Sequence, residues 1–180
     1  MVDLSVPKNK RSESRFEAQH NLYIMRHEVT QMMYNRFGYS PEKYEAKIQK
    51  YRERFADKEN VDEIVSRMEV KLTAFNEWFI ENERNAVAEL MREIQDNFSK
   101  GNSIFPSDNP AREQEYIERR LCMDKAIGAC NALKQELQYI ISELPVDINK
   151  YKNVSDVIDK QISLIKGVRR SDNKFLKRKE

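Results

Sequence analysis

Glycine, proline and cysteine are scarce in this chain, with four Gly, five Pro and two Cys among 180 residues. So few turn-forming residues argue against a protein of many short strands and favour a few long helices. No apolar run approaches the ~18 residues that a membrane-spanning helix needs, and residues 1–8 lack the apolar core of a signal peptide. We therefore expect one domain without a membrane span.

The two cysteines, Cys122 and Cys130, stand eight residues apart in one expected helix. At ~1.5 Å of rise per residue their backbones are about 12 Å apart, which is too far for a disulfide. Free thiols fit a reducing compartment, so the cytoplasm is the expected location.

Sequence motifs of catalysis are also missing. The chain has no glycine-rich phosphate loop, no nucleophile signature and no His/Cys cluster with metal spacing. His20 and His27 are seven residues, or about 10 Å, apart on one expected helix, too far for one ion, and Glu17-x-x-His20 has no second copy. We predict a non-enzymatic protein with no catalytic residue, metal ligand or cofactor.

Charge, by contrast, is abundant and unevenly distributed. Residues 145–180 hold ten Lys and Arg against five Asp and Glu, whereas residues 41–144 hold sixteen against twenty-one. Clustered cations attract polyanions by releasing condensed counterions, which favours a nucleic acid as partner. The alternative is a solvated helix end. Most of the excess lies in one run: Lys166, Arg169, Arg170, Lys174, Lys177, Arg178 and Lys179.

Apolar residues recur with helical spacing in four long segments, which predicts an all-α, antiparallel four-helix bundle spanning residues 1–180. Ser14-x-x-Glu17 has the pattern of a capping box, Gly38 is expected to end the first helix, and Asp147 to begin the last. A shorter helical piece over 41–60 predicts an additional arm, and 171–180 a basic C-terminal tail.

Several of these helices carry a second apolar stripe. A lone bundle needs one apolar face per helix, so the surplus predicts self-association through a repeated surface. The aromatic stripe of the first helix fits packing against a helix or subunit better than a base-stacking surface. Gly128 costs its helix about 1 kcal/mol relative to Ala, which suggests that another backbone approaches it closely. The expected interface comprises Phe16, Tyr23, Tyr34, Leu121, Gly128 and Ala132.

Three patches of the chain resemble one bacterial and phage family. They are residues 6–14, then 104–107 with 118–120 and 125–130, then 165–174. In order and spacing they are similar to four-helix-bundle proteins that include the accessory variability determinant of diversity-generating retroelements. Relatives are encoded in intervening sequences of large ribosomal RNA genes. Residues 41 to about 85 depart from the shorter members.

The resemblance implies a homopentameric barrel that binds template RNA and the element's reverse transcriptase. The alternative is an oligomeric helical scaffold that binds protein only, and the salt dependence of RNA binding separates the two. Match of position, together with the basic run, gives six candidate nucleic-acid contacts: Arg119, Arg120, Lys166, Arg169, Arg170 and Lys174.

Overall fold

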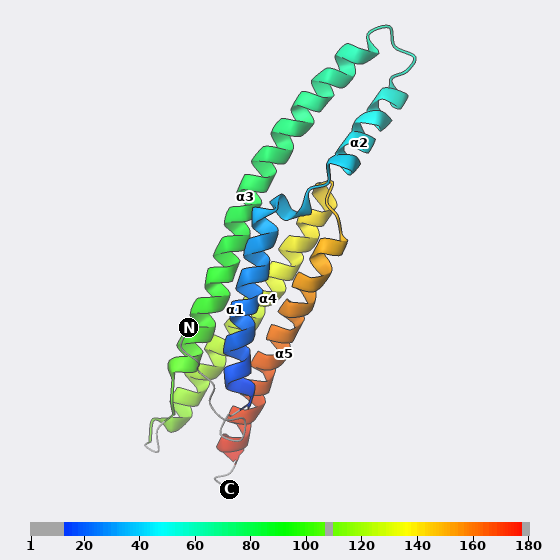
Figure 1. Cartoon of the computed structure of the whole chain (residues 1–180). Coiled ribbons are helices and arrows are strands. Elements are labelled where there is room, and N and C mark those ends of the chain that lie inside the picture. The colour runs from blue at the N-terminus through cyan, green and yellow to red at the C-terminus, as the bar shows by residue number, and fades with distance from the viewer. Residues whose placement is uncertain (1–12, 107–109, 178–180) are drawn as a thin grey trace.

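The computed structural model describes residues 13–106 and 110–177, with side chains over 16–106 and 110–173. The described part is helical throughout, apart from short links and one isolated β-bridge between Tyr39 and Val146, which confirms the all-α prediction (Figure 1). The elements are α1 (Glu13–Tyr34), a 3-10 turn η2 (Arg36–Gly38), α2 (Pro41–Arg54), α3 (Val61–Ser103), α4 (Arg112–Glu143) and α5 (Asn149–Lys177).

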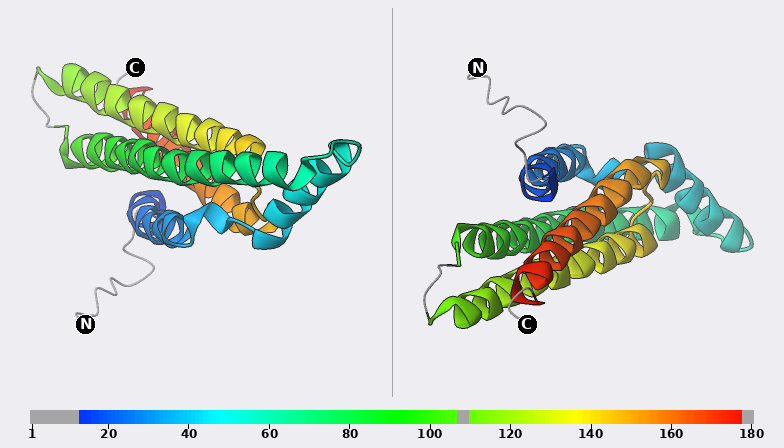
Figure 2. Two further views of the ribbon diagram at one scale, coloured as in Figure 1. Left: turned by 90° about the horizontal axis from the view of Figure 1, so that it is seen from above. Right: turned by 90° about the horizontal axis from the view of Figure 1, so that it is seen from below.

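Four of the helices, α1, α3, α4 and α5, form an antiparallel bundle (Figure 1). Seen along its length in both views of Figure 2, α1 and α4 occupy opposite corners, with α3 and α5 between them. The closest pairings are α3 with α4 and α1 with α5. The outward sides of α1 and α4 therefore lie on opposite flanks of the bundle.

The bundle core follows most of the expected apolar stripes. On α1, Ala18, Leu22, Met25 and Val29 are fully buried, and on α5 the run from Tyr151 to Val168 is buried at helical spacing. Ile148 is exposed because it precedes the helix.

Helix α3 buries different sides along its length. It runs without interruption through residues 81–85. Its buried face includes Ile80, Val87 and Met91, whereas Trp78 is 61 % exposed. The reason is that one part of this 43-residue helix contacts α2 and the rest contacts α4 and α1, so no single stripe describes its buried side.

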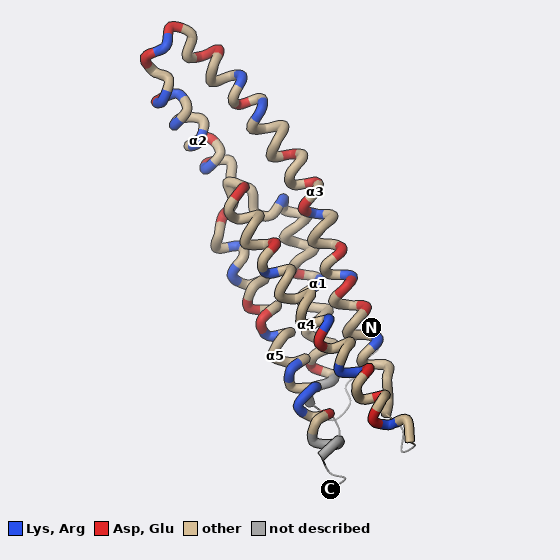
Figure 3. The backbone as a smooth tube through the Cα atoms, turned by 180° about the vertical axis from the view of Figure 1, so that it is seen from behind, with Lys and Arg blue, Asp and Glu red and all other residues tan. Residues whose placement is uncertain are grey.

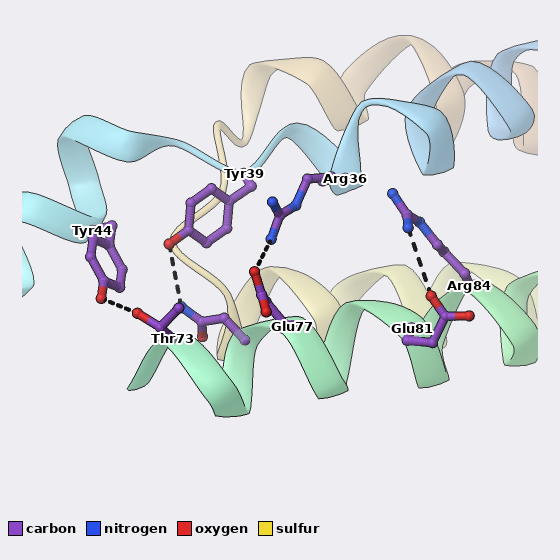
Figure 4. Close-up of polar contacts among 8 residues, drawn as sticks. Arg36, Tyr39, Tyr44, Thr73, Glu77, Glu81 and Arg84 are labelled. Carbon is purple, nitrogen blue, oxygen red and sulfur yellow. Dashed lines mark hydrogen bonds and ion pairs between the residues drawn. The ribbon is translucent and has the colours of Figure 1, made fainter. Parts of the chain in front are cut away.

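The arm consists of α2 and the first turns of α3, which extend beyond the bundle (Figure 3). Ser40 caps α2, since its Oγ accepts from the Lys43 backbone N–H, and Pro41 occupies the first turn. The Tyr44 hydroxyl lies 2.6 Å from Thr73 Oγ1 and contacts the Glu69 carbonyl (Figure 4). Because α2 packs along α3, the arm includes more than the expected residues 41–60.

The arm leaves the bundle at a strained junction. Arg36, Phe37 and Gly38 all have φ between 52° and 71°, so α1 ends at Tyr34 rather than at Phe37. Left-handed conformations of non-glycine residues cost about 1–3 kcal/mol each and need support from the surroundings. That support comes from the fully buried Phe37 ring and from two backbone hydrogen bonds to the α4–α5 link, Ser40 N–H to Pro145 O at 2.7 Å and Asp147 N–H to Gly38 O at 2.9 Å.

The close helix crossing lies at Gly101 and not at Gly128. A Cβ on Gly101 would meet Met123 Cε at 3.0 Å and Cys122 Cβ at 3.1 Å, whereas a Cβ on Gly128 would meet nothing within 4 Å. Within one chain, therefore, the expected close approach at Gly128 is wrong. Gly101 lies inside α3 and lets α4 approach.

The last helix begins as expected and ends later. The Asn149 backbone N–H donates to Asp147 Oδ1 at 3.1 Å, which confirms Asp147 as the capping residue. Helix α5 then continues to Lys177, so most of the expected tail over 171–180 is helical, and residues 178–180 lie outside the described part.

A carboxyl pair lies between α3 and α4. Glu83 is only 9 % exposed, and its Oε2 has no hydrogen-bond partner in the described part of the chain. Burial, followed by the hydrogen bond and negative charge of Glu136, raises the pKa of Glu83 to about 7. The folded protein therefore holds a proton here that the unfolded chain releases near pH 4.5.

This pKa difference predicts a pH-dependent stability. The contribution of Glu83 is greatest below pH 4.5, falls as pH rises to about 7, and is constant above that. Glu83→Gln should therefore raise the denaturation midpoint at pH 8 much more than at pH 5. The exposed Glu89→Gln serves as control. Equal shifts for Glu83→Gln at both pH values would contradict the assignment.

Candidate nucleic-acid interface

The first turns of α4 and the last turns of α5 lie at the same end of the bundle, away from the arm (Figure 1). Two ion pairs join them, Arg119 Nε to Asp172 Oδ2 at 2.7 Å and Arg169 Nη1 to Asp124 Oδ1 at 2.6 Å. The two groups of expected contact residues, 119–120 and 166–174, are therefore brought together. We refer to this region as the basic end; Lys and Arg positions gather there along α5 (Figure 3).

Arg119 is not available to a nucleic acid, which corrects its assignment as a contact residue. It is 2 % exposed. Besides its bond to Asp172, its Nη1 donates to the carbonyls of Gly101 at 2.9 Å and Ile104 at 3.0 Å. A buried guanidinium is stable only when such acceptors surround it, so Arg119 joins the end of α3 to α4 and α5.

Arg169 and Arg120 share one carboxylate. Asp124 lies 2.6 Å from Arg169 and 3.9 Å from Arg120. The Arg169 side chain is 25 % exposed and that of Arg120 is 52 % exposed. The shared carboxylate offsets part of their charge, and Arg169 faces the helix interface more than solvent.

The remaining cations of the basic end are more accessible. Lys166 and Arg170 are exposed on α5, and no carboxylate of the described residues lies within 4.0 Å of either charged group. Lys174 belongs to the last turns of α5, but its side chain lies outside the described residues. Lys166 and Arg170 are therefore accessible cations at this end, and Arg120 on α4 is half-exposed.

Two apolar stripes are partly exposed in the described part of the chain. On α1, Phe16, Tyr23 and Tyr34 are exposed by 42 %, 58 % and 79 %. On α4, Leu121 is 54 % exposed and Gly128 is open, while Ala132 is half-buried. The six expected interface residues thus form two separate surfaces at opposite corners of the bundle.

Other chemistry receives little support from the described residues. His20 and His27 are exposed, and the described part holds no group of three or more His, Cys, Asp or Glu placed to bind a metal ion.

Burial raises the pKa of Cys130 to about 12, which keeps its thiol protonated. A groove of about 340 Å³ between α4 and α5 is lined by apolar side chains such as Leu137 and Ile141 and by polar ones such as Lys134 and Gln138. Over the described ranges no helix is long and apolar enough to cross a bilayer.

Acidic residues near the cations form specific ion pairs, which the charge counts of the sequence did not indicate. Asp172 binds Arg119, and Asp159 binds Lys134 with Oδ1 at 2.7 Å from Nζ. Asp124 was overlooked altogether, although its i,i+4 spacing from Arg120 signals a pair on one helix. Its pairing with Arg169 could not be read from the sequence, because it depends on how α4 and α5 are rotated against each other.

No family model, curated protein or solved structure matches this chain. The likeness to the accessory variability determinants therefore remains an expectation based on the three sequence patches.

The role of Arg119 leads to a stability prediction. Arg119→Ala leaves Asp172 and two carbonyls without their donor, and breaking a buried pair costs about 3–5 kcal/mol. Arg120→Ala, which removes the same side chain from an exposed neighbouring position, should cost less than about 1 kcal/mol. Urea denaturation followed by circular dichroism measures both. Equal losses from the two variants would show that Arg119 does not hold the helix ends together.

Proposed function

We propose that this protein is a non-enzymatic RNA-binding accessory subunit of a reverse transcriptase, acting in a diversity-generating retroelement. The observation that carries the proposal is the accessible pair of cations Lys166 and Arg170 at the basic end, which have no carboxylate partner among the described residues. The sequence resemblance indicates that this RNA is the template RNA of the element and that the second partner is its reverse transcriptase.

The fold gives these cations a fixed platform. Lys166 and Arg170 are four residues apart on α5, so they lie on one side of that helix. Phosphate oxygens accept from both side chains without regard to base, so the surface would bind RNA through its backbone. Because Arg119 anchors this end of α5 through Asp172, the cations keep their spacing as RNA binds.

A ring would multiply this surface. A closed ring needs two different complementary faces per subunit, since each subunit contacts its two neighbours differently. The α1 stripe and the α4 stripe are two such faces, and their location at opposite corners suits a head-to-tail arrangement (Figure 2). We propose a homopentamer in which the basic ends of five chains act together.

The second candidate is a helical scaffold that binds protein only. The observation in its favour is the pairing of Arg119, Arg120 and Arg169, which leaves less free charge than the sequence indicated. The same exposed apolar stripes would then bind other proteins. The salt dependence of RNA binding separates the two functions.

The RNA-binding proposal is tested by Lys166→Gln combined with Arg170→Gln. Binding to a structured RNA, measured by fluorescence anisotropy over a salt series, should weaken, and the slope of log K against log salt should fall by about two. The control is Lys152→Gln with Lys160→Gln, which removes the same charge from exposed positions elsewhere on α5. If the first variant binds as the parent does, the scaffold function is favoured.

Assembly is tested by the same substitution at two glycines. Gly128→Leu should leave the single chain folded, because nothing lies within 4 Å of the new Cβ, but should reduce the particle mass measured by light scattering. Gly101→Leu should instead destabilise the fold, since overpacking a core costs about 1–3 kcal/mol. A parent particle of 21.4 kDa at micromolar concentration would refute the oligomer.

A further inference from the structure

Helix α2 places four cations on one face. Lys43, Lys47, Lys50 and Arg54 follow one another at intervals of four, three and four residues. At 3.6 residues per turn these positions fall within an arc of about 60°. Lys43, Lys50 and Arg54 are exposed and Lys47 is partly so. We call these four residues the α2 cationic face.

The acidic residues of α2 lie elsewhere on the helix. The helical period places Glu53 and Glu42 about 60° and 80° from the nearest edge of the cationic arc, and Glu45 on the far side of the helix. A third face, containing Tyr44, packs on α3. Residues 41–60 contain six Lys and Arg against five Asp and Glu, so the segregation does not follow from an excess of positive charge.

The cations of this face also differ from their neighbours in their partners. Within the described residues, no carboxylate lies within 4.0 Å of the charged group of any of the four, although Lys43 donates to the Val146 carbonyl at 2.5 Å. Elsewhere in the arm, Arg52 pairs with Asp62 at 3.1 Å, Lys58 pairs with Asp57 at 3.5 Å, and Arg67 pairs with Glu63.

An unpaired cationic face costs the helix stability. Like charges three or four residues apart repel by about 0.2–0.5 kcal/mol per pair, and the α2 cationic face contains three such pairs. Interleaving them with the glutamates of the same helix would remove this repulsion and keep the arm equally charged. The arrangement instead creates a local field that attracts a polyanion.

We propose that the α2 cationic face is a separate binding site for the phosphate backbone of duplex RNA. From residue 43 to residue 54 the face extends about 16 Å along the helix axis. Phosphates of one strand recur every ~3.4 Å along the axis of a B-form duplex. They are closer together along an A-form RNA duplex, so the face spans at least about five of them. Binding is independent of base sequence, because the side chains contact phosphate oxygens alone.

The site is distinct from the basic end. The arm and the end of α5 lie at opposite ends of the molecule (Figure 1). Helix α5 has 29 residues and is therefore about 43 Å long, so a short duplex bound to one site does not reach the other. The inference consequently does not depend on the RNA-binding function assigned to Lys166 and Arg170.

The test uses the full chain with Lys166→Gln and Arg170→Gln as background, so that loss at one site is not mistaken for loss at the other. The probe is a 12-base-pair RNA duplex. In this background, Lys47→Gln, Lys50→Gln and Arg54→Gln together should weaken binding at least tenfold at low salt and reduce the salt slope by about three. Lys43 is left in place because it contacts Val146.

The matched control is Lys58→Gln, Arg67→Gln and Lys71→Gln, which removes three charges from the same arm off this face, and its binding should stay within about twofold of the background. Lys47→Arg with Lys50→Arg keeps the charge and should bind as the background does, with unchanged helicity by circular dichroism. Equal loss from both triple variants, or none from the first, would overturn the proposal.

Polyglutamate distinguishes an acidic protein from a nucleic acid as the occupant. Duplex RNA has a higher charge density and releases more counterions, so polyglutamate should compete only at a much higher concentration of negative charge. Displacement of the duplex at an equal concentration of charge would mean that the face takes acidic protein, and the nucleic-acid proposal would then be wrong.

Discussion

The buried guanidinium of Arg119 is the interaction on which the arrangement of the basic end depends. One side chain donates to Asp172 on α5 and to two carbonyls at the end of α3. Removing a charge from water is costly, and here several short, charge-assisted hydrogen bonds offset that cost. The three helices consequently meet in one arrangement. Lys166 and Arg170 lie on the outward side of α5 because the inward side of this helix carries the buried residues Ile162, Ile165 and Val168.

The opposite end of the bundle is held differently. There the backbone passes through three left-handed residues, and the fully buried Phe37 ring with hydrogen bonds to the α4–α5 link keeps this conformation in place. The arm starts from this fixed point, so the direction of α2 is set by the bundle and not by a flexible linker. A rigid start matters for the α2 cationic face, because cations at fixed spacing bind a regular polyanion with less loss of conformational entropy.

Between the two ends, buried polar groups restrict how the helices can slide. Asn21 on α1 donates to Gln161 Oε1 at 2.9 Å and to the Val157 carbonyl at 3.1 Å, both on α5. A shift of α1 along α5 would leave these groups unpaired in the core, at a cost of about 1–3 kcal/mol. Glu83 has the opposite effect, because its burial near Glu136 makes the α3–α4 contact weaker as the carboxyl ionises.

The sequence alone determined the helices and most of the buried stripes, because the period of apolar residues reports directly which side of a helix avoids water. It also determined local signals such as the Asp147 cap and the left-handed Gly38, which depend on near neighbours in the chain. The proximity of residues 119–120 and 166–174 also follows from the helix pattern, since antiparallel helices joined by a short link place the start of one beside the end of the next.

Only the tertiary structure decided which charges and glycines take part in packing. Helical spacing gives a residue's direction around its own helix, but not the neighbour that it faces. Arg119 and Arg120 are adjacent in the sequence, yet one is buried against Asp172 and the other is half-exposed. Gly101 and Gly128 likewise have the same chemistry, but only Gly101 lies where α3 and α4 cross closely, because the position of that crossing depends on the whole bundle.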